Sequence, residues 1–338
     1  MIRFEDSAAF DRALAALPEP DASATAAAAA RQAELTKPAG SLGRLEEIAL
    51  FMAGWQGKER PRAERIRAAI FAGNHGVAVR GVSAFPPAVT AQMVANFQAG
   101  GAAINALAAS CGAELCIVPL DLDRPTADIC EAPAMSEPEC LDALNAGAAV
   151  VTAGTDLLFV GEMGIANTTP AAALCAQSFG GLAQDWIGRG TGIDDSGLAR
   201  KADAVARAIA LHGPHCTSAF ETLRRLGGRE IAAMAGAILA ARHLSVPMLL
   251  DGFISSAAIA PLARDNPAIT AHCLAAHSSA ETGHARLLQA LGLKPLLHLE
   301  MRLGEGSGGA VAAQIVRSAL AAHAGMATFA EAAVAGAL

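Results

Sequence analysis

The spacing of hydrophobic positions changes once along the chain, near residue 65. Before that point apolar residues recur at helical spacing, as in GRLEEIALFMAGW at 43–55, and an alanine tract has the same character. After it, short apolar runs alternate with longer alanine-rich segments of helical spacing. The pattern predicts helices over the first sixty residues and strands at 65–73, 113–123, 155–164, 246–253, 268–277 and 294–303.

The runs after residue 65 are apolar on both faces, and helical segments separate them. Such strands are typical of a parallel sheet that is covered on both sides. We therefore predict an α/β fold, with a Rossmann-like parallel sheet and helices on both faces. One helix follows the last predicted strand, so we expect the chain's end to pack with the N-terminal helices. This gives a large α/β domain at 63–311 and a small helical domain built from both chain ends, 1–62 and 312–338.

Polar, glycine-rich segments follow the predicted strands. Open parallel sheets bind ligands at the carboxyl ends of their strands, so these segments form the candidate site. They are GNHGV at 73–77, DLD at 121–123, GEMGIANTTP at 161–170, DGFISS at 251–256, HSSAETGH at 277–284 and GEGSGG at 304–309.

The segment GEGSGG satisfies the G-x-G-x-x-G pattern of a dinucleotide-binding turn, but Glu305 lies between its first two glycines. A carboxylate there would repel a pyrophosphate, and too few residues follow for a second βα unit. One alternative is a tight helix-entry turn in which Glu305 is an incidental first-turn acid. We favour the other, in which the glycines let a ligand approach closely and Glu305 accepts a proton from it.

Two further segments have the features of an anion site. In GEMGIANTTP, Glu162 and two glycines precede a helix start, where free backbone N–H groups favour an anion. In IGRGTGIDDSGLARK at 187–201, three alternating glycines are followed by Lys201, which is sufficient for one phosphate. A capped turn and a solvated loop with a surface lysine are the alternative interpretations of these segments.

The histidines are weaker signals. HGPHC places His212, His215 and Cys216 close together, but it lies in a Pro/Gly loop with no second ligand pair, so we predict no metal site there. His75 and His277 follow predicted strands, where a functional and a structural role are both open.

Composition narrows the class of function. A net charge of −7 leaves no basic field for nucleic acid, and the absence of tyrosine leaves acid–base chemistry to other side chains. The start of the chain lacks the basic and apolar regions of a secretory signal, and the apolar runs are too short to span a bilayer. The seven cysteines are scattered and form no C-x-x-C pair. We therefore expect a soluble, cytoplasmic protein with reduced thiols and no membrane or nucleic-acid partner.

Several motifs occur together in one order: LTKPAGSLGRLE at 35–46, HGV, GEMGIANTTPAAA, the glycine loop with Lys201, LLDGFISSAA, HSSAETG and MRLGEGSGGA. In this order the chain resembles, over essentially its whole length, the nicotinate-nucleotide:dimethylbenzimidazole phosphoribosyltransferase family of cobalamin biosynthesis. The resemblance implies transfer of the 5-phosphoribosyl group of nicotinate mononucleotide to 5,6-dimethylbenzimidazole, giving α-ribazole 5′-phosphate and nicotinate. It also implies a homodimer of two-domain subunits that needs no cofactor and no metal.

The resemblance further implies roles for particular residues. Glu305 matches the catalytic base, and the phosphate and ribose side of the site maps onto Glu162, Gly164, Gly190 and Lys201. Other substrate contacts fall on Phe85, Met93, His75, Ser278, Leu303 and Gly304.

Two departures from the family pattern concern the base site. Asn74 precedes His-Gly-Val where the best-known members have aspartate. Phe85 and Met93 stand where a serine and a glutamine approach the benzimidazole in those members. The preferred azole is therefore left open by the sequence.

The residues suit a metal-free transfer. Because the pyridine nitrogen of nicotinate mononucleotide is quaternary, nicotinate leaves without an acid to protonate it. We hypothesise that Glu305 removes the azole N–H proton while the other ring nitrogen attacks C1′ with inversion, and that Glu162 holds a ribose hydroxyl or stabilises oxocarbenium character. The rival hypotheses are a nicotinamide-dependent oxidoreductase and a non-catalytic nucleotide-binding subunit.

Overall fold

The computed structural model, which describes residues 2–190 and 192–335, contains a five-stranded parallel sheet in the order β2-β1-β3-β4-β5. Its strands are β1 (Ile66–Ala72), β2 (Ala113–Pro119), β3 (Leu157–Met163), β4 (Met248–Leu250) and β5 (Cys273–Ala275). The strand order reverses between β1 and β3, so their carboxyl ends lie at a switch point of the topology. The predicted α/β class with a parallel sheet is confirmed.

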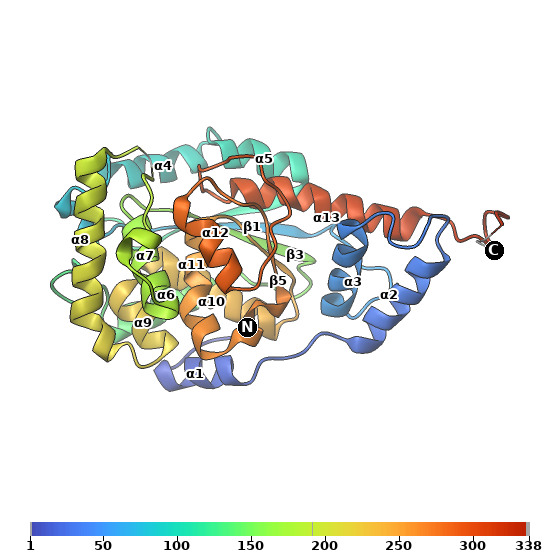
Figure 1. Ribbon diagram of the computed structural model, residues 1–338, viewed down its shortest axis with the longest axis horizontal. Coiled ribbons are helices and arrows are strands. Elements are labelled where there is room, and N and C mark those ends of the chain that lie inside the picture. The colour runs from blue at the N-terminus through green and yellow to red at the C-terminus, as the bar shows by residue number, and fades with distance from the viewer. Residues whose placement is uncertain (1, 191, 336–338) are drawn as a thin grey trace.

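The strands are apolar on both faces because alternate side chains enter two different cores. Phe71 and Val160 pack into one core, and Ile70 and Phe159 pack into the other. Figure 1 shows the helices on both sides of the sheet. The first core contains residues of α6 (Glu137–Ala149), α7 (Thr168–Phe179), α10 (Arg229–His243) and α11 (Phe253–Asp265), and the second contains residues of α3 (Arg44–Gln56), α5 (Ala103–Cys111) and α13 (Ser307–Gly325).

The remaining helices surround these layers. They are α1 (Ser7–Ala15), α2 (Ala22–Glu34), α4 (Ala88–Gln98), α8 (Asp195–His212), α9 (Ala219–Leu226) and α12 (Thr282–Ala290), with the short 3₁₀ helices η1 (Gly76–Arg80), η2 (Ala183–Asp185), η3 (Gly213–His215) and η4 (Pro267–His272). The predicted helices of the first sixty residues are confirmed. Among the described residues, no helix combines the length and apolar character needed to cross a membrane.

The two chain ends meet where α2 and α3 lie beside the C-terminal part of α13 (Figure 1). Arg31 of α2 donates to the carbonyls of His323, Ala324 and Met326, which satisfies groups that a helix end leaves without partners. The first helix does not join this group, because Phe10 of α1 packs on the ring of Phe220 in α9. Met1 and residues 336–338 of the predicted small domain lie outside the described residues, and the boundaries at 62 and 312 stay predictions.

Two predicted strands were wrong in part or in full. Residues 294–303 form no strand and keep one bridge, between Leu297 and His277. Pro295 removes a ladder donor, and Glu300 has a positive φ of 55°, so the segment cannot stay extended. Of residues 268–277, the first part is the 3₁₀ helix η4, which begins at Pro267, and the strand β5 is limited to Cys273–Ala275.

The crossing of α6 and α10 depends on two glycines. A Cβ on Gly147 would overlap the carbonyl oxygen of Ala233, and a Cβ on Gly236 would overlap that of Leu144. These backbones therefore touch without intervening side chains, and the contact holds α10 against β1 and β3. The N-terminus of α10 carries Glu230, which lies behind the candidate site.

We predict that Gly236→Ala lowers the free energy of unfolding by at least about 2 kcal/mol, because the new methyl group must push two helix backbones apart. Urea denaturation followed by circular dichroism measures the change. The matched control is Gly325→Ala in α13, where a Cβ meets open space, and there the change should stay within about 1 kcal/mol. Equal effects of the two substitutions would contradict the close crossing.

Candidate functional site

A cavity opens at the carboxyl edge of the sheet, where the segments after β3, β4 and β5 meet the segment before α13. It contains about 890 Å³ of space, including the part open to solvent. The residues that line it come from six places in the chain: Val82 and Ser83; Glu162–Thr168; Arg189, Gly190 and Ile193; Asp251–Ser255; His277, Ser279 and Glu281; and Arg302–Gly304. The polar segments that the sequence places after β3, β4 and β5 therefore share one cavity.

Glu305 occupies a strained backbone position beside this cavity. Gly304, Glu305 and Gly306 have φ values of 80°, 59° and 76°, so a glutamate stands in the left-handed region between two glycines. A non-glycine residue persists there when its surroundings hold it, and such positions are concentrated at functional sites. The side chain of Glu305 is buried, and loss of hydration raises the pKa of its carboxyl group.

Asp251 fastens this strained segment to the sheet. It follows directly after β4, and its carboxylate accepts hydrogen bonds from Gly306 N at 3.1 Å and Gly309 N at 2.9 Å. Burial raises the pKa of Asp251 to about 7, although the N–H groups of the loop oppose that rise. The segment is also pressed against β3, since a Cβ on Gly161 would overlap the Gly306 nitrogen.

Glu162 lies at the end of β3, where its carboxylate accepts a hydrogen bond from the side-chain amide of Asn167. Burial raises the pKa of Glu162 to about 8, opposed by this hydrogen bond and helped by the charges of Glu230, Asp251 and Glu305. Four carboxyl groups therefore lie close together at this end of the sheet, and two of them, Glu162 and Asp251, line the cavity. The charges of the other three make Glu162 harder to ionise.

His75 lies behind the cavity wall and does not line it. Its Nε2 is 2.6 Å from Oε1 of Glu230, and both side chains are buried. The pair fills the space beside Gly164, because a Cβ there would approach Glu230 Oε1 to 3.0 Å and His75 Nε2 to 3.2 Å. Asn74 is also buried, and its amide donates to the carbonyl of Leu122.

Lys201 lies beneath the glycine loop. Its Nζ donates to Thr168 Oγ1 at 3.0 Å and to the Gly188 carbonyl at 2.9 Å, and the side chain is 1 % exposed. Burial lowers the pKa of Lys201 to about 8. Gly190 lines the cavity and Lys201 is directly behind it, since a Cβ on Gly190 would stand 3.6 Å from Nζ. The third N–H of the ammonium group has no partner among the described protein atoms.

The other predicted contacts lie in different surroundings. Leu303 and Gly304 line the cavity, and Leu303 is 55 % exposed. Ser278 donates its backbone N–H to Leu297, whereas its neighbour Ser279 lines the cavity. Phe85 and Met93 do not line it: Phe85 is 48 % exposed, and Met93 packs against the core that contains α3, α5 and α13.

Sequence reasoning missed several residues that line the cavity. Ser279 is one, because the pattern does not distinguish it from Ser278; its N–H donates to His284 Nδ1, which fixes the serine in place. Arg189 and Arg302 are two others, and they place cations at the entrance beside Gly190. The signal that could have found them was position, since Arg189 lies inside the glycine loop and Arg302 directly before GEGSGG.

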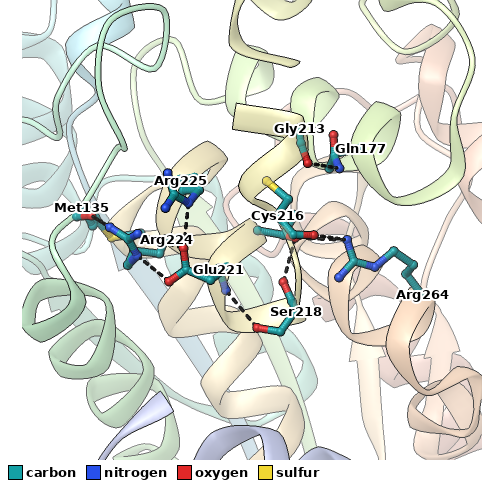
Figure 2. Close-up of polar contacts among 10 residues, drawn as sticks. Met135, Gln177, Gly213, Cys216, Ser218, Glu221, Arg224, Arg225 and Arg264 are labelled. Atoms are coloured by element: carbon teal, nitrogen blue, oxygen red, sulfur yellow. Dashed lines mark hydrogen bonds and ion pairs between the residues drawn. The ribbon is translucent and has the colours of Figure 1, made fainter. Parts of the chain in front are cut away.

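The HGPHC loop is held by structural hydrogen bonds. Figure 2 shows Gln177 donating to the Gly213 carbonyl and Arg264 donating to the Cys216 carbonyl. His212 contacts the Ile129 carbonyl through Nε2, and burial lowers its pKa. In the described part of the chain, no group of three or more His, Cys, Asp or Glu side chains is arranged to hold a metal ion.

Comparisons with known proteins agree with one another. A family model described as phosphoribosyltransferase matches residues 17–334. Nicotinate-nucleotide–dimethylbenzimidazole phosphoribosyltransferases from Novosphingobium aromaticivorans and Mesorhizobium japonicum are 65% and 57% identical over 335 and 318 residues, covering 99% and 94% of this chain and 99% and 95% of theirs. The crystal structure of CobT from Thermus thermophilus matches with a TM-score of 0.87 and 39% identity, over 93% of this chain and 100% of that one.

The raised pKa of Glu162 predicts a pH-dependent effect on stability. The carboxyl group is neutral in the folded protein up to about pH 8, whereas in the unfolded chain it ionises near its ordinary value of 4.5. The folded state therefore loses stability as the pH rises from about 5 to 8. In Glu162→Gln this loss is absent, so the melting temperature of the variant relative to the wild type should rise steadily between pH 5 and 8.5.

The matched control is Glu139→Gln. Backbone and side-chain hydrogen bonds from Ser136, together with Arg229, hold the pKa of Glu139 at about 2, so its charge does not change above pH 5. The offset between this variant and the wild type should stay constant from pH 6 to 8.5. A constant offset for Glu162→Gln as well would mean that Glu162 ionises normally in the fold.

Proposed function

Since the chain belongs to the phosphoribosyltransferase family, we propose that it transfers the 5-phosphoribosyl group of nicotinate mononucleotide to 5,6-dimethylbenzimidazole, with inversion at C1′. The products are α-ribazole 5′-phosphate and nicotinate. The reaction belongs to assembly of the nucleotide loop of cobalamin.

The observation that carries this proposal is the separation of charge within one cavity. The carboxyl groups of Glu162, which lines the cavity, and Glu305, which lies beside it, are at the end of the sheet, and the cations of Arg189 and Arg302 are in the lining at the glycine loop. Nicotinate mononucleotide has a cationic pyridinium–ribose bond at one end and a phosphate at the other. The carboxyl groups favour positive charge at C1′, and the cations with the loop amides favour the phosphate.

Glu305 is the proposed general base. Its raised pKa suits a carboxylate that must take a proton near neutral pH, because burial removes the water that would otherwise stabilise its charge. It takes the N–H proton of the azole, and the lone pair of the other ring nitrogen forms the new bond to C1′. The C1′–N bond to the pyridine ring breaks at the same time, and its electron pair stays on the departing nicotinate.

Glu162 is proposed to act on the ribose. Protonated up to about pH 8, it can donate a hydrogen bond to a ribose hydroxyl, and in molecules where it is already ionised its charge stabilises positive charge at C1′. Asn167 fixes the orientation of its carboxyl group. Gly164, Gly190 and Gly304 line the cavity and are proposed to contact the nucleotide through their backbone, and Leu303 offers an apolar surface at the entrance.

Four proposed substrate contacts do not line the cavity in this structure: Phe85, Met93, His75 and Ser278. They stand outside the cavity lining, so each needs a movement of its segment or acts through a neighbour: His75 through Glu230, and Ser278 through Ser279. Phe85 lies two residues from Ser83, which lines the cavity and accepts its backbone N–H.

We also propose a homodimer in the cytoplasm. The large apolar side chains of Phe85, Leu299 and Leu303 are about half exposed, which favours a covering partner, and the cysteines are free.

Two rival functions, an oxidoreductase and a binding subunit, can be distinguished from the transferase, the first by the fold and the second by an assay. An oxidoreductase requires a second βα unit after GEGSGG, whereas α13 is followed by no strand among residues 326–335. A binding subunit would hold nicotinate mononucleotide without releasing nicotinate. Release of nicotinate that depends on added dimethylbenzimidazole supports the transferase, and binding without release supports the rival.

We predict that Glu305→Gln lowers kcat by about 10²-fold or more, because the amide cannot accept the azole proton. The two KM values should change by less than about threefold, since the shape of the side chain is kept. Steady-state measurement of α-ribazole 5′-phosphate tests this. Glu300→Gln is the matched control: Glu300 is the other glutamate of this segment with a positive φ, but it is exposed, and kcat should be unchanged. Near-normal turnover of Glu305→Gln would rule out this base.

We predict that Lys201→Met raises the KM for nicotinate mononucleotide by about 10-fold or more, because one charge-assisted hydrogen bond to phosphate is lost. The KM for the azole should change by less than about twofold. Arg207→Met, on the exposed side of the same helix α8, should leave both values unchanged. An equal rise in both KM values for Lys201→Met would argue against a phosphate contact.

A further inference from the structure

We infer that Asp251 is a positioning residue for Glu305, and that its carboxylate, rather than the loop itself, holds the proposed base in its working conformation. The inference rests on the proposed function, in which Glu305 takes the azole proton. Asp251 does not need to touch either substrate in this role, because it acts through the backbone of the GEGSGG segment.

The loop's own support around Glu305 is one turn hydrogen bond, from Ser307 N to the Gly304 carbonyl at 3.0 Å. Gly306 is the N-cap residue of α13, and with no side chain it makes no capping hydrogen bond. The first N–H groups of a helix need a hydrogen-bond acceptor. In α13 this acceptor is Asp251, the residue that follows β4. Asp251 spans the first turn, since one carboxylate oxygen receives Gly306 N and the other receives Gly309 N. The cap therefore comes from β4 across the sheet edge.

The anchor point is rigid. β4 pairs with β3 on one side and β5 on the other, and Leu250, the residue before Asp251, is fully buried. Asp251 itself is 2 % exposed, and a Cβ on Gly308 would approach its Oδ1 to 2.9 Å while overlapping His277. Asp251 also lines the cavity, so its two hydrogen bonds, rather than a lack of space, hold the carboxylate on the loop, where it fixes the residue directly after Glu305.

The strain of the loop makes this anchor necessary. Three consecutive residues have positive φ, and the middle one is a glutamate, a conformation that is unfavourable for a residue with a side chain unless its surroundings hold it. Its carboxyl group also lies near Glu162 and Asp251, and its charge contributes to the raised pKa of both. Without the two hydrogen bonds, the loop can relax by moving Glu305 toward solvent. A displacement of about 1 Å from the reacting atoms is enough to lower a rate by about 10²-fold.

The test is Asp251→Asn, which keeps the volume but turns one acceptor into an NH₂ group facing a backbone N–H. We expect kcat to fall by about 10- to 100-fold, with the KM for nicotinate mononucleotide within about twofold of the wild type. The matched control is Asp156→Asn: Asp156 is a buried carboxylate at the opposite end of the sheet that also accepts two backbone N–H groups, those of Glu64 and Arg65. It should lose comparable thermal stability and keep kcat.

The double variant Asp251→Asn/Glu305→Gln separates positioning from a general structural loss. If Asp251 acts through Glu305, adding Asp251→Asn to Glu305→Gln should lower kcat by no more than about twofold. A full additional loss would overturn the inference, as would an unchanged kcat in Asp251→Asn alone. If instead Glu305→Gln keeps normal turnover, the proposed base is wrong, and that result is visible without Asp251.

A measurement on the wild type covers the case in which Asp251→Asn does not fold. Amide hydrogen exchange of residues 304–310 reports whether the N–H groups of Gly306 and Gly309 are bonded in the free enzyme. We expect them to exchange at least about 100-fold more slowly than unprotected amides. Exchange at the unprotected rate would overturn the inference.

Discussion

The burial of several carboxyl groups at one edge of a parallel sheet is the constraint on which the rest of the site depends. Glu162, Glu230, Asp251 and Glu305 lie together at the ends of β3 and β4 and at the starts of α10 and α13. Isolated buried carboxylates are unfavourable, so each needs a proton, a hydrogen bond or a cation. Glu230 has His75, Asp251 has backbone N–H groups, and Glu162 has Asn167 and a raised pKa. Glu305 is the member whose carboxylate accepts no hydrogen bond from the described part of the chain, and this leaves it free to act on a ligand.

The two cores around the sheet are what make this arrangement tolerable. Both faces of β1 and β3 are fully covered, and the backbones of α6 and α10 touch at Gly147 and Gly236, so the strand ends cannot shift to relieve the repulsion. A site of this kind is destabilising in the free protein and is compensated when a cation binds. In the function proposed above, the pyridinium–ribose group supplies that charge, and the carboxylates are proposed to favour the build-up of positive charge at C1′. The free protein is therefore less stable because of this site, and binding of the substrate offsets that loss.

The fold could be predicted from the sequence because its signals are local. Strands such as Ile66–Ala72 are buried on both faces and have no polar residue that contradicts the pattern except Arg67, and the helices of the first sixty residues have regular apolar spacing. The prediction failed at 294–303, where the apolar content resembles a strand but the backbone carries a proline and positive φ at Glu300. The hydrophobic pattern indicates which residues are buried, but it does not indicate their backbone φ angles. A loop that packs against the sheet can therefore have the same pattern as a strand.

The same limit explains the candidate site. Glu305 and Glu162 were accessible to sequence reasoning because a charge beside glycines at a strand end contradicts the local pattern, and such contradictions concentrate at functional sites. Asp251 was placed in a polar segment but not given a role, since its partners Gly306 and Gly309 are 55 and 58 residues away along the chain. Ser278 and Ser279 are adjacent, yet Ser279 lines the cavity whereas the N–H of Ser278 is bonded to Leu297. The contacts of these residues are with parts of the chain that are far away in sequence, and only the folded structure shows which parts come together. The sequence shows that Glu305 is unusual, but it does not show what stabilises its backbone conformation. In the inference drawn above, Asp251 provides that stabilisation, and nothing in the sequence distinguishes Asp251 from other polar residues after a strand.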